Sequence, residues 1–198
     1  MTGKRRYHDS IDPGRRLRML DNEGRGKWLR VNDLIKELNV NKGMTCIDLG
    51  CGAGALSFSL AEAVGREGTV YAVDTNTDAI NRIREKNPPE NLITINSSAD
   101  RTGLDDGIAD VCFTIMLLHE VDRPEDILAE AYRLLKPGGR IAAIEWKYEA
   151  EIPGPPPSER ISREQAEQLF NQAGYREHLY KDWTQNLYLF TGTKADSA

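Results

Sequence analysis

The sequence contains few cysteines, and it has no long hydrophobic run. Its three cysteines are an odd number, and two of them, Cys46 and Cys112, lie inside apolar runs. This argues against a disulfide framework and favours a reducing compartment, so we expect a cytoplasmic protein. No apolar run approaches the roughly 20 residues that cross a membrane. The first residues also lack the apolar core of a signal peptide. We therefore expect neither a membrane-spanning segment nor a signal peptide.

Histidine and cysteine are too sparse to form the usual metal-binding patterns. The chain has three of each, and none of them has the spacing of a zinc site. A pocket for a soft metalloid needs several neighbouring thiolates, which Cys46, Cys51 and Cys112 do not supply. We therefore predict that the site holds no metal.

Positive charge is concentrated at the N-terminus. The chain has a net charge of −5, yet its first 30 residues hold nine Lys and Arg against four Asp and Glu. Such a segment can attract nucleic acid or an anionic substrate. It lacks the aromatic side chains of a single-strand binding platform, which argues against nucleic acid. We interpret residues 1–23 as a basic leader that acts as a lid, and residues 24–198 as a single domain.

Short apolar runs alternate with helical patterns along most of the chain. Strands are expected at 44–49, 69–74, 91–96, 108–117 and 140–146, and helices between them at 54–65, 77–87 and 123–136. This order predicts an α/β protein with a Rossmann-like, doubly wound, mostly parallel sheet in three layers, α/β/α.

The C-terminal part has a different character. A proline-rich loop at 151–160 precedes a helix at 161–175, and residues 176–183 and 186–194 alternate like strands. Their short connection predicts an antiparallel C-terminal hairpin, which brings the sheet to seven strands.

Three helices have further sequence signals. Asp122 with Glu125, and Ser162 with Gln165, have the spacing of a capping box. In residues 26–38 the apolar side chains fall on one helical face, which predicts a single amphipathic helix there.

The stretch CIDLGCGAG, residues 46–54, carries the strongest functional signal. Gly50, Gly52 and Gly54 follow an apolar run at alternate positions. Ligands of open α/β sheets bind at the carboxyl ends of the strands, and glycine permits positive φ and close backbone approach there. The pattern therefore predicts a ligand-binding turn.

Two nucleotide ligands fit this turn. Gly50, Gly52 and Ala55 satisfy a loose dinucleotide fingerprint, and Asp74 ends the next strand, where an acid holds ribose hydroxyls. The fingerprint alone leaves NAD open. Asp48 argues against NAD, because a carboxylate beside the turn opposes a pyrophosphate at a helix N-terminus. S-adenosylmethionine has no phosphate, and its ammonium and sulfonium suit an acidic pocket.

Five motifs together resemble those of class I S-adenosylmethionine-dependent methyltransferases. In order they are CIDLGCGAG, VYAVD, SSAD, IADVCFTIMLLHEV and RLLKPGGRIAAIEW. The resemblance covers residues 25–193 and is closest to the small stand-alone branch near the ubiquinone/menaquinone methyltransferases. It implies a methyltransferase that uses S-adenosylmethionine and releases S-adenosylhomocysteine.

The resemblance also assigns cofactor contacts. Contacts with the methionine part are assigned to Asp48, Gly50, Cys51, Gly52 and Gly54, and contacts with the ribose to Asp74, Thr75 and Asn76. Contacts with the adenine are assigned to Ser98, Ala99 and Asp100, and Met116 is expected beneath the cofactor. The family usually has an acid where Ser98 stands, and here the acid, Asp100, comes two residues later.

Methyl transfer is an in-line displacement, so the protein mainly aligns the reactants and excludes water. A general base helps when the nucleophile carries a proton. His119 and Glu120 follow the fourth expected strand, at the edge where the acceptor should lie. We predict that His119 is the base, since imidazole exchanges protons near neutral pH, and that Glu120 orients the ring or binds a cationic acceptor.

Little chain is available to cover an acceptor, which predicts a small-molecule acceptor or a group on the surface of a larger molecule. Three alternatives stay open: a nicotinamide-dependent oxidoreductase, a non-catalytic cofactor-binding or partner subunit, and an RNA or protein methyltransferase. The oxidoreductase alternative is weakened because the chain lacks an evident catalytic Tyr/Lys pair. Methylation of nucleic-acid bases is weakened because MLLHEV at 116–121 differs from the Asn-Pro-Pro-aromatic signature of base-methylating relatives. We expect a monomer or a homodimer.

Overall fold

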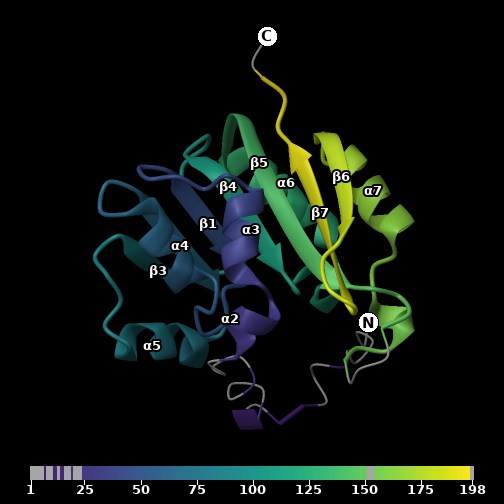
Figure 1. The fold of residues 1–198 in the computed structure, drawn as a ribbon, viewed down its shortest axis with the longest axis horizontal. Coiled ribbons are helices and arrows are strands. Elements are labelled where there is room, and N and C mark those ends of the chain that lie inside the picture. The colour runs from purple at the N-terminus through teal and green to yellow at the C-terminus, as the bar shows by residue number, and fades with distance from the viewer. Residues whose placement is uncertain are drawn as a thin grey trace.

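A computed structural model describes residues 24–150 and 154–196, together with Tyr7, Ile11, Asp12, Gly14, Arg15 and Met19. Seven strands form one sheet in the order β3-β2-β1-β4-β5-β7-β6. The strands are β1 Thr45–Leu49, β2 Thr69–Asp74, β3 Leu92–Asn96, β4 Ala109–Ile115, β5 Leu135–Trp146, β6 Arg176–Asp182 and β7 Leu187–Thr193. Strand β7 runs antiparallel to β5 and β6, whereas the other pairs are parallel. The expected doubly wound sheet with its C-terminal hairpin is confirmed (Figure 1).

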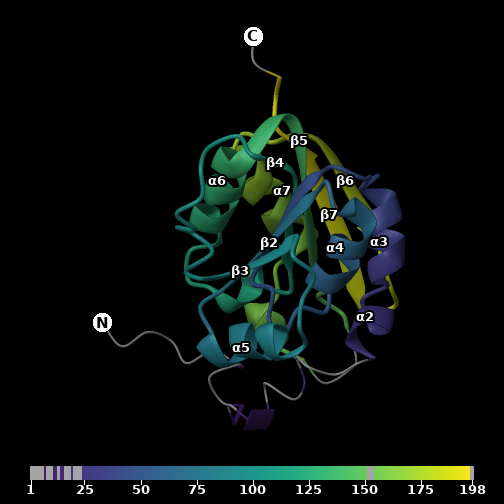
Figure 2. The same cartoon turned by 90° about the vertical axis from the view of Figure 1, so that its left-hand side faces the viewer.

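Helices cover both faces of the sheet. They are α2 Arg25–Trp28, α3 Val31–Glu37, α4 Ser57–Val64, α5 Thr77–Glu85, α6 Pro124–Leu134 and α7 Arg163–Gln172, with short 3-10 helices η2 Leu118–Glu120 and η3 Pro157–Glu159. Figure 2 shows α3 and α4 on one side of the sheet and α6 and α7 on the other. Among the described residues, no helix combines the length and the apolar character of a membrane span.

The two faces of the sheet build two separate cores. Cys46 and Phe113 point toward the core that α3, α4 and α5 complete, and their neighbours Ile47 and Cys112 point toward the core under α6 and α7. Strands of a parallel sheet are buried on both faces, which explains why their sequences are nearly continuous apolar runs.

Two of the local expectations about helices are wrong. Residues 26–38 do not form one helix, because Arg30 adopts the left-handed conformation (φ 54°) and separates α2 from α3. The Arg30 guanidinium holds this break by donating to Trp183 O at 2.9 Å and to Asp33. Helix α6 has Arg123 at its N-cap and no capping side-chain hydrogen bond, so Asp122 does not form the expected capping box.

The capping box of α7 is confirmed. Ser162 Oγ accepts from Gln165 N, and Gln165 Oε1 accepts from Ser162 N. Strand β5 begins at Leu135, earlier than expected, because residues 136–139 bulge within it instead of forming a separate turn. Since β1 to β5 run parallel, their carboxyl ends share one edge of the sheet, and the predicted site residues lie along it.

Candidate functional site

The glycine turn after β1 requires glycine for geometric reasons. Gly50, Gly52 and Gly54 have φ of 73°, 53° and 85°, a region that residues with a Cβ avoid. A Cβ at Gly50 would lie 2.8 Å from Leu117 Cδ1, and one at Gly54 would lie 3.0 Å from Ile83 Cγ1. The turn therefore needs glycine both for its positive φ and because the side chains of Leu117 and Ile83 leave no room for a Cβ.

The end of β2 holds this turn in place. Val73 O accepts hydrogen bonds from Gly50 N at 2.8 Å and Cys51 N at 3.0 Å. Asp74 Oδ2 accepts from Gly52 N at 2.8 Å, and Asp74 Oδ1 accepts from Asn76 N at 2.8 Å. Because each carboxylate oxygen can accept more than one hydrogen bond, the half-buried Asp74 retains acceptor capacity for hydroxyl groups.

Thr75 and Asn76 lie on the exposed turn between β2 and α5. The Asn76 side chain caps α5 by accepting from Asp78 N at 3.0 Å and Ala79 N at 3.2 Å. Asn96 supports the turn by donating to Asp74 O and Thr75 O. The structure thus gives Asn76 a structural role, and its predicted contact with the cofactor stays a prediction.

Asp48 is a buried acid next to the turn. It is 2% exposed, and its Oδ2 accepts a hydrogen bond from Ser57 Oγ at 2.6 Å. Burial raises the pKa of Asp48 to about 7; the charge of Asp74 adds to this rise, and the Ser57 hydrogen bond opposes it. A cation near Asp48 would favour its charged form, so the site suits a cationic ligand.

Cys51 is part of the same turn and is unsuited to thiolate chemistry. Burial, with the charges of Asp48 and Asp74 as smaller causes, raises the pKa of the Cys51 thiol well above its ordinary value. Its contribution to the turn is therefore its backbone.

The segment after β3 carries the three predicted adenine contacts. Ser98 and Asp100 are exposed, and Ser98 Oγ donates to Asp100 Oδ1. Ala99 is buried against the core under α6 and α7.

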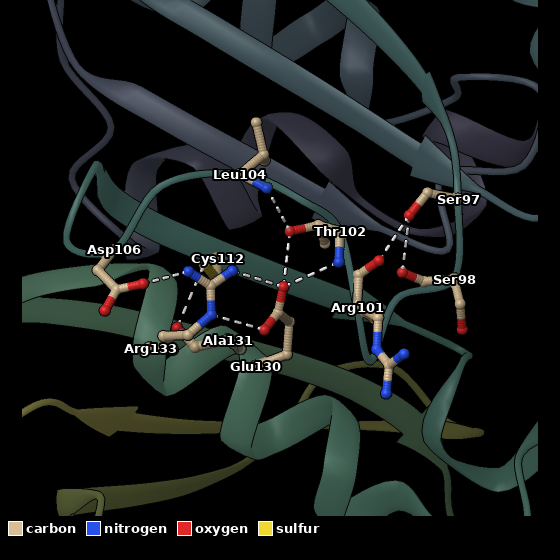
Figure 3. A network of polar contacts seen from close by, with 10 residues as sticks. All are labelled: Ser97, Ser98, Arg101, Thr102, Leu104, Asp106, Cys112, Glu130, Ala131 and Arg133. Carbon is tan, nitrogen blue, oxygen red and sulfur yellow. Dashed lines mark hydrogen bonds and ion pairs between the residues drawn. The ribbon is translucent and has the colours of Figure 1, made fainter.

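A buried glutamate anchors the chain that follows this segment (Figure 3). Glu130 Oε1 accepts from Thr102 N at 2.9 Å and Thr102 Oγ1 at 2.6 Å, and Arg133 donates to both of its carboxylate oxygens. Arg133 also pairs with Asp106. Burial raises the pKa of Glu130, but these hydrogen bonds outweigh it and hold the pKa below its ordinary value.

Met116 directly follows β4 and has an unusual backbone conformation. It has φ of 57°, it is 7% exposed, and its N–H donates to Ile144 O at 2.8 Å. Non-glycine residues in the left-handed region are strained, and such strain is typical of functional sites. The bend directs the chain into η2.

Helix η2 places His119 against a carboxylate from β5. His119 Nδ1 lies 2.5 Å from Glu145 Oε2, and both side chains are 1% exposed. The other oxygen, Glu145 Oε1, accepts from Leu118 N at 2.8 Å. A carboxylate at Nδ1 favours the tautomer in which Nδ1 carries the hydrogen, which makes Nε2 the proton-accepting nitrogen of the neutral ring.

Glu145, rather than Glu120, is therefore the carboxylate that contacts Nδ1. Glu120 is half-buried at the end of η2. Sequence reasoning missed Glu145, although an acid near the end of the apolar strand RIAAIEW was a usable signal.

His119 lines a cavity of about 320 Å³ near η3 and α7. The other lining residues are Leu118, Val121, Asp122, Pro124, Ser158, Glu159, Arg160, Ile161, Gln165, Gln168, Leu169 and Gln172. Among them Arg160 is buried, and its guanidinium binds the loop after β5 through backbone carbonyl groups. The guanidinium carbon lies 6.0 Å from the Trp146 ring centre.

Comparison with known proteins supports a specific family. Residues 47–143 match the family described as "Methyltransferase domain". The demethylmenaquinone methyltransferase of Oceanobacillus iheyensis is 31% identical over 116 residues, which cover 57% of this chain and 49% of that protein. The ubiquinone/menaquinone biosynthesis C-methyltransferase UbiE of Brucella anthropi is 33% identical over 115 residues, which cover 56% and 43%. The chain thus spans about half the length of these curated relatives.

A solved structure is similar over nearly the whole chain. The crystal structure of a SAM dependent methyltransferase from Aquifex aeolicus superposes with a TM-score of 0.86 at 28% sequence identity. The alignment covers 94% of this chain and 100% of that one.

Proposed function

The chain belongs to the class I S-adenosylmethionine-dependent methyltransferases, and on this premise we propose that it methylates a small-molecule acceptor. The observation that carries the proposal is a juxtaposition at one sheet edge. An acidic glycine turn follows β1, and a buried His119–Glu145 pair lies where β4 and β5 end.

The residues of the turn fit the cofactor. Asp48 suits its cationic groups, and Asp74 has acceptor capacity for the ribose hydroxyls. The other residues that we assign to the cofactor are Gly50, Cys51, Gly52, Gly54, Thr75, Asn76, Ser98, Ala99, Asp100 and Met116. When bound, S-adenosylmethionine supplies an electrophilic methyl group whose bond to sulfur breaks as the acceptor's lone pair bonds to carbon.

His119 takes up the proton in this proposal. Its Nε2 accepts the proton that the nucleophilic atom loses, and Glu145 stabilises the charged ring through Nδ1. Glu145 acts through His119 and is a positioning residue. The 2.8 Å hydrogen bond from Leu118 N holds the Glu145 carboxylate of β5 against η2, and this sets the orientation of the His119 ring. We retain Glu120 as a second candidate for contact with the acceptor.

The domain division is also a proposal, with residues 1–23 as a leader that covers the acceptor. Most of the leader lies outside the described residues, but Tyr7 N donates to Glu159 Oε2 at 2.9 Å, and Glu159 lines the cavity. Deleting residues 1–20 should lower turnover more than cofactor affinity. If the deletion removed only RNA or DNA binding, the leader would instead serve nucleic-acid contact.

Calorimetry tests the cofactor site directly. S-adenosylmethionine and S-adenosylhomocysteine should bind, and NADH should not. Asp74→Ala should weaken S-adenosylmethionine binding by more than ~1.5 kcal/mol, because charge-assisted hydrogen bonds are lost. Asp78→Ala is the matched control, since it removes a neighbouring exposed acid in the first turn of α5. NADH binding, or unchanged affinity in Asp74→Ala, would contradict the assignment.

Acceptor screening with radiolabelled S-adenosylmethionine tests the reaction itself. A small molecule that gains label in an enzyme-dependent way supports the proposal. If the cofactor binds and only a protein or RNA gains label, the acceptor class is wrong and the fold serves a macromolecule.

A further inference from the structure

Arg160 is a buried cation with no carboxylate partner in the part of the chain that the structure describes. It is 8% exposed; Nε donates to Pro155 O at 2.8 Å, and Nη1 donates to the carbonyl oxygens of Lys147, Tyr148 and Ala150. All four acceptors are neutral, and Nη2 has no hydrogen-bond partner among the described residues. A buried charge gains most from an opposite charge with good hydrogen-bond geometry, so this guanidinium is a favourable site for an anion.

Helix α7 adds neutral hydrogen-bonding groups to the same cavity. Gln165, Gln168 and Gln172 follow one another at intervals of three and four residues, which puts them on one face of the helix. Within residues 24–150 and 154–196, the side-chain amides of Gln168 and Gln172 have no hydrogen-bond partner. Covering such groups with a long hydrocarbon would leave them desolvated and unpaired, which is costly. The lining therefore favours a polar acceptor.

Two carboxylates limit how much negative charge the cavity accepts. Asp122 and Glu159 line it together with Arg160, so an acceptor with more than one anionic group would be repelled. The volume of about 320 Å³ lies at the lower end of small-molecule sites and fits a ring with a few substituents.

From these features we propose that the cavity binds a small acceptor with a single oxyanion group, a carboxylate or a phosphate. The oxyanion pairs with the guanidinium of Arg160, and the atom to be methylated lies toward His119. This inference rests on the proposed methyl transfer only in naming the ligand an acceptor, because the anion site itself is a property of the cavity.

Binding of three matched probes to the full chain tests the site without any methyl transfer. The probes are benzoate, phenyl phosphate and the neutral benzamide, measured by calorimetry with S-adenosylhomocysteine present. We expect one of the two anions to bind at least tenfold more tightly than benzamide, and the better anion identifies the oxyanion. Equal binding of all three probes, or no binding of any, overturns the proposal.

A charge placed on α7 locates the site without disturbing the fold. Gln168→Glu puts a negative charge on the cavity wall at an exposed position, and it should weaken the preferred anion about fivefold or more. Asn171→Glu adds the same charge to an exposed position of α7 that does not line the cavity, and it should leave binding unchanged. Equal effects of the two variants would place the anion elsewhere.

Variants of Arg160 test the counter-charge itself. Arg160→Lys should keep a reduced preference for the anion over benzamide, and Arg160→Gln should abolish it. Circular dichroism identifies a variant that fails to fold, in which case the α7 pair decides. If S-adenosylmethionine does not bind but the anion preference follows these variants, the proposed function fails and the anion site stands. If labelled methyl groups are transferred but the chain shows no preference for the anions over benzamide, the proposed function stands and the anion site fails.

Discussion

Glu130 on α6 and Glu145 on β5 are both buried, and each accepts a backbone N–H and at least one side-chain donor. They differ in the cation that they face. Glu130 faces Arg133, whose guanidinium stays charged at any physiological pH and whose other side pairs with Asp106. Glu145 faces His119, an imidazole that can gain or lose a proton and that lines a cavity.

This difference separates a structural role from a functional one. The Glu130 network is satisfied within the chain, and it fixes the segment from Thr102 to Leu104 behind the predicted adenine contacts. The Glu145 pair includes a titratable ring whose proton can be exchanged with a ligand. Burial and hydrogen bonding alone would not distinguish the two carboxylates, whereas the nature of the partner does.

The largest expected effect belongs to His119→Ala. Turnover should fall by roughly 100-fold or more, the usual scale for a positioned base. Cofactor affinity should barely change, because the cofactor is expected to be held from β1 and β2. The loss should shrink as pH rises and the acceptor deprotonates unaided. His178→Ala, on β6, is the control, and wild-type turnover in His119→Ala would refute the role of the base.

Glu130→Gln should act on stability instead. It removes the charge that Arg133 pairs with, and it should lower the free energy of unfolding by about 2 kcal/mol. For a chain of this size the melting temperature should fall by roughly 4–8 °C. Turnover per folded molecule should stay near wild type. A variant of unchanged stability and reduced turnover would assign Glu130 to the site and remove the contrast.

Glu145→Gln should show the reverse pattern, with a smaller effect than His119→Ala. We expect kcat to fall about tenfold, less than when the base itself is removed, because the ring stays in place but loses the carboxylate that orients it. The acidic limb of the kcat–pH profile should move to lower pH, since the carboxylate no longer favours the charged ring. A purely structural role would lower the melting temperature and leave this profile in place.

Asp48 is a third buried carboxylate, and Asp48→Asn tests its raised pKa through the pH dependence of stability. Because the pKa of Asp48 is raised to about 7, the native state holds a proton that the unfolded state has already released above pH ~4. Wild-type stability should therefore decline between about pH 4 and pH 7 on account of this group. Asp48→Asn should melt at a higher temperature than wild type at pH 8 and at nearly the same temperature at pH 4. Parallel melting curves across this range would contradict the raised pKa.

The sequence was most informative where the pattern is local. Strand β2 has the predicted bounds, and the Ser162–Gln165 box forms as its spacing indicates. The glycine turn is also local, because its positive φ and its place after a strand depend on a few neighbouring residues.

Contacts between distant segments could not be read from such patterns. Glu145 meets His119 only because β4 and β5 are adjacent, and Arg160 gains its importance from carbonyl groups up to 13 residues away. The break at Arg30 likewise depends on the carbonyl of Trp183, which no local propensity encodes. Sequence thus predicted the sheet edge and the turn, whereas the partners of buried charged groups required the fold.

The bend at Met116 has a consequence for protein engineering. Its left-handed backbone costs a residue with a β-carbon on the order of 1 kcal/mol, which glycine would not incur. A search for thermostable variants would therefore be drawn to Met116→Gly, which would also remove the side chain expected to lie beneath the cofactor. At this position, selection for thermal stability would favour glycine, whereas selection for turnover would favour methionine.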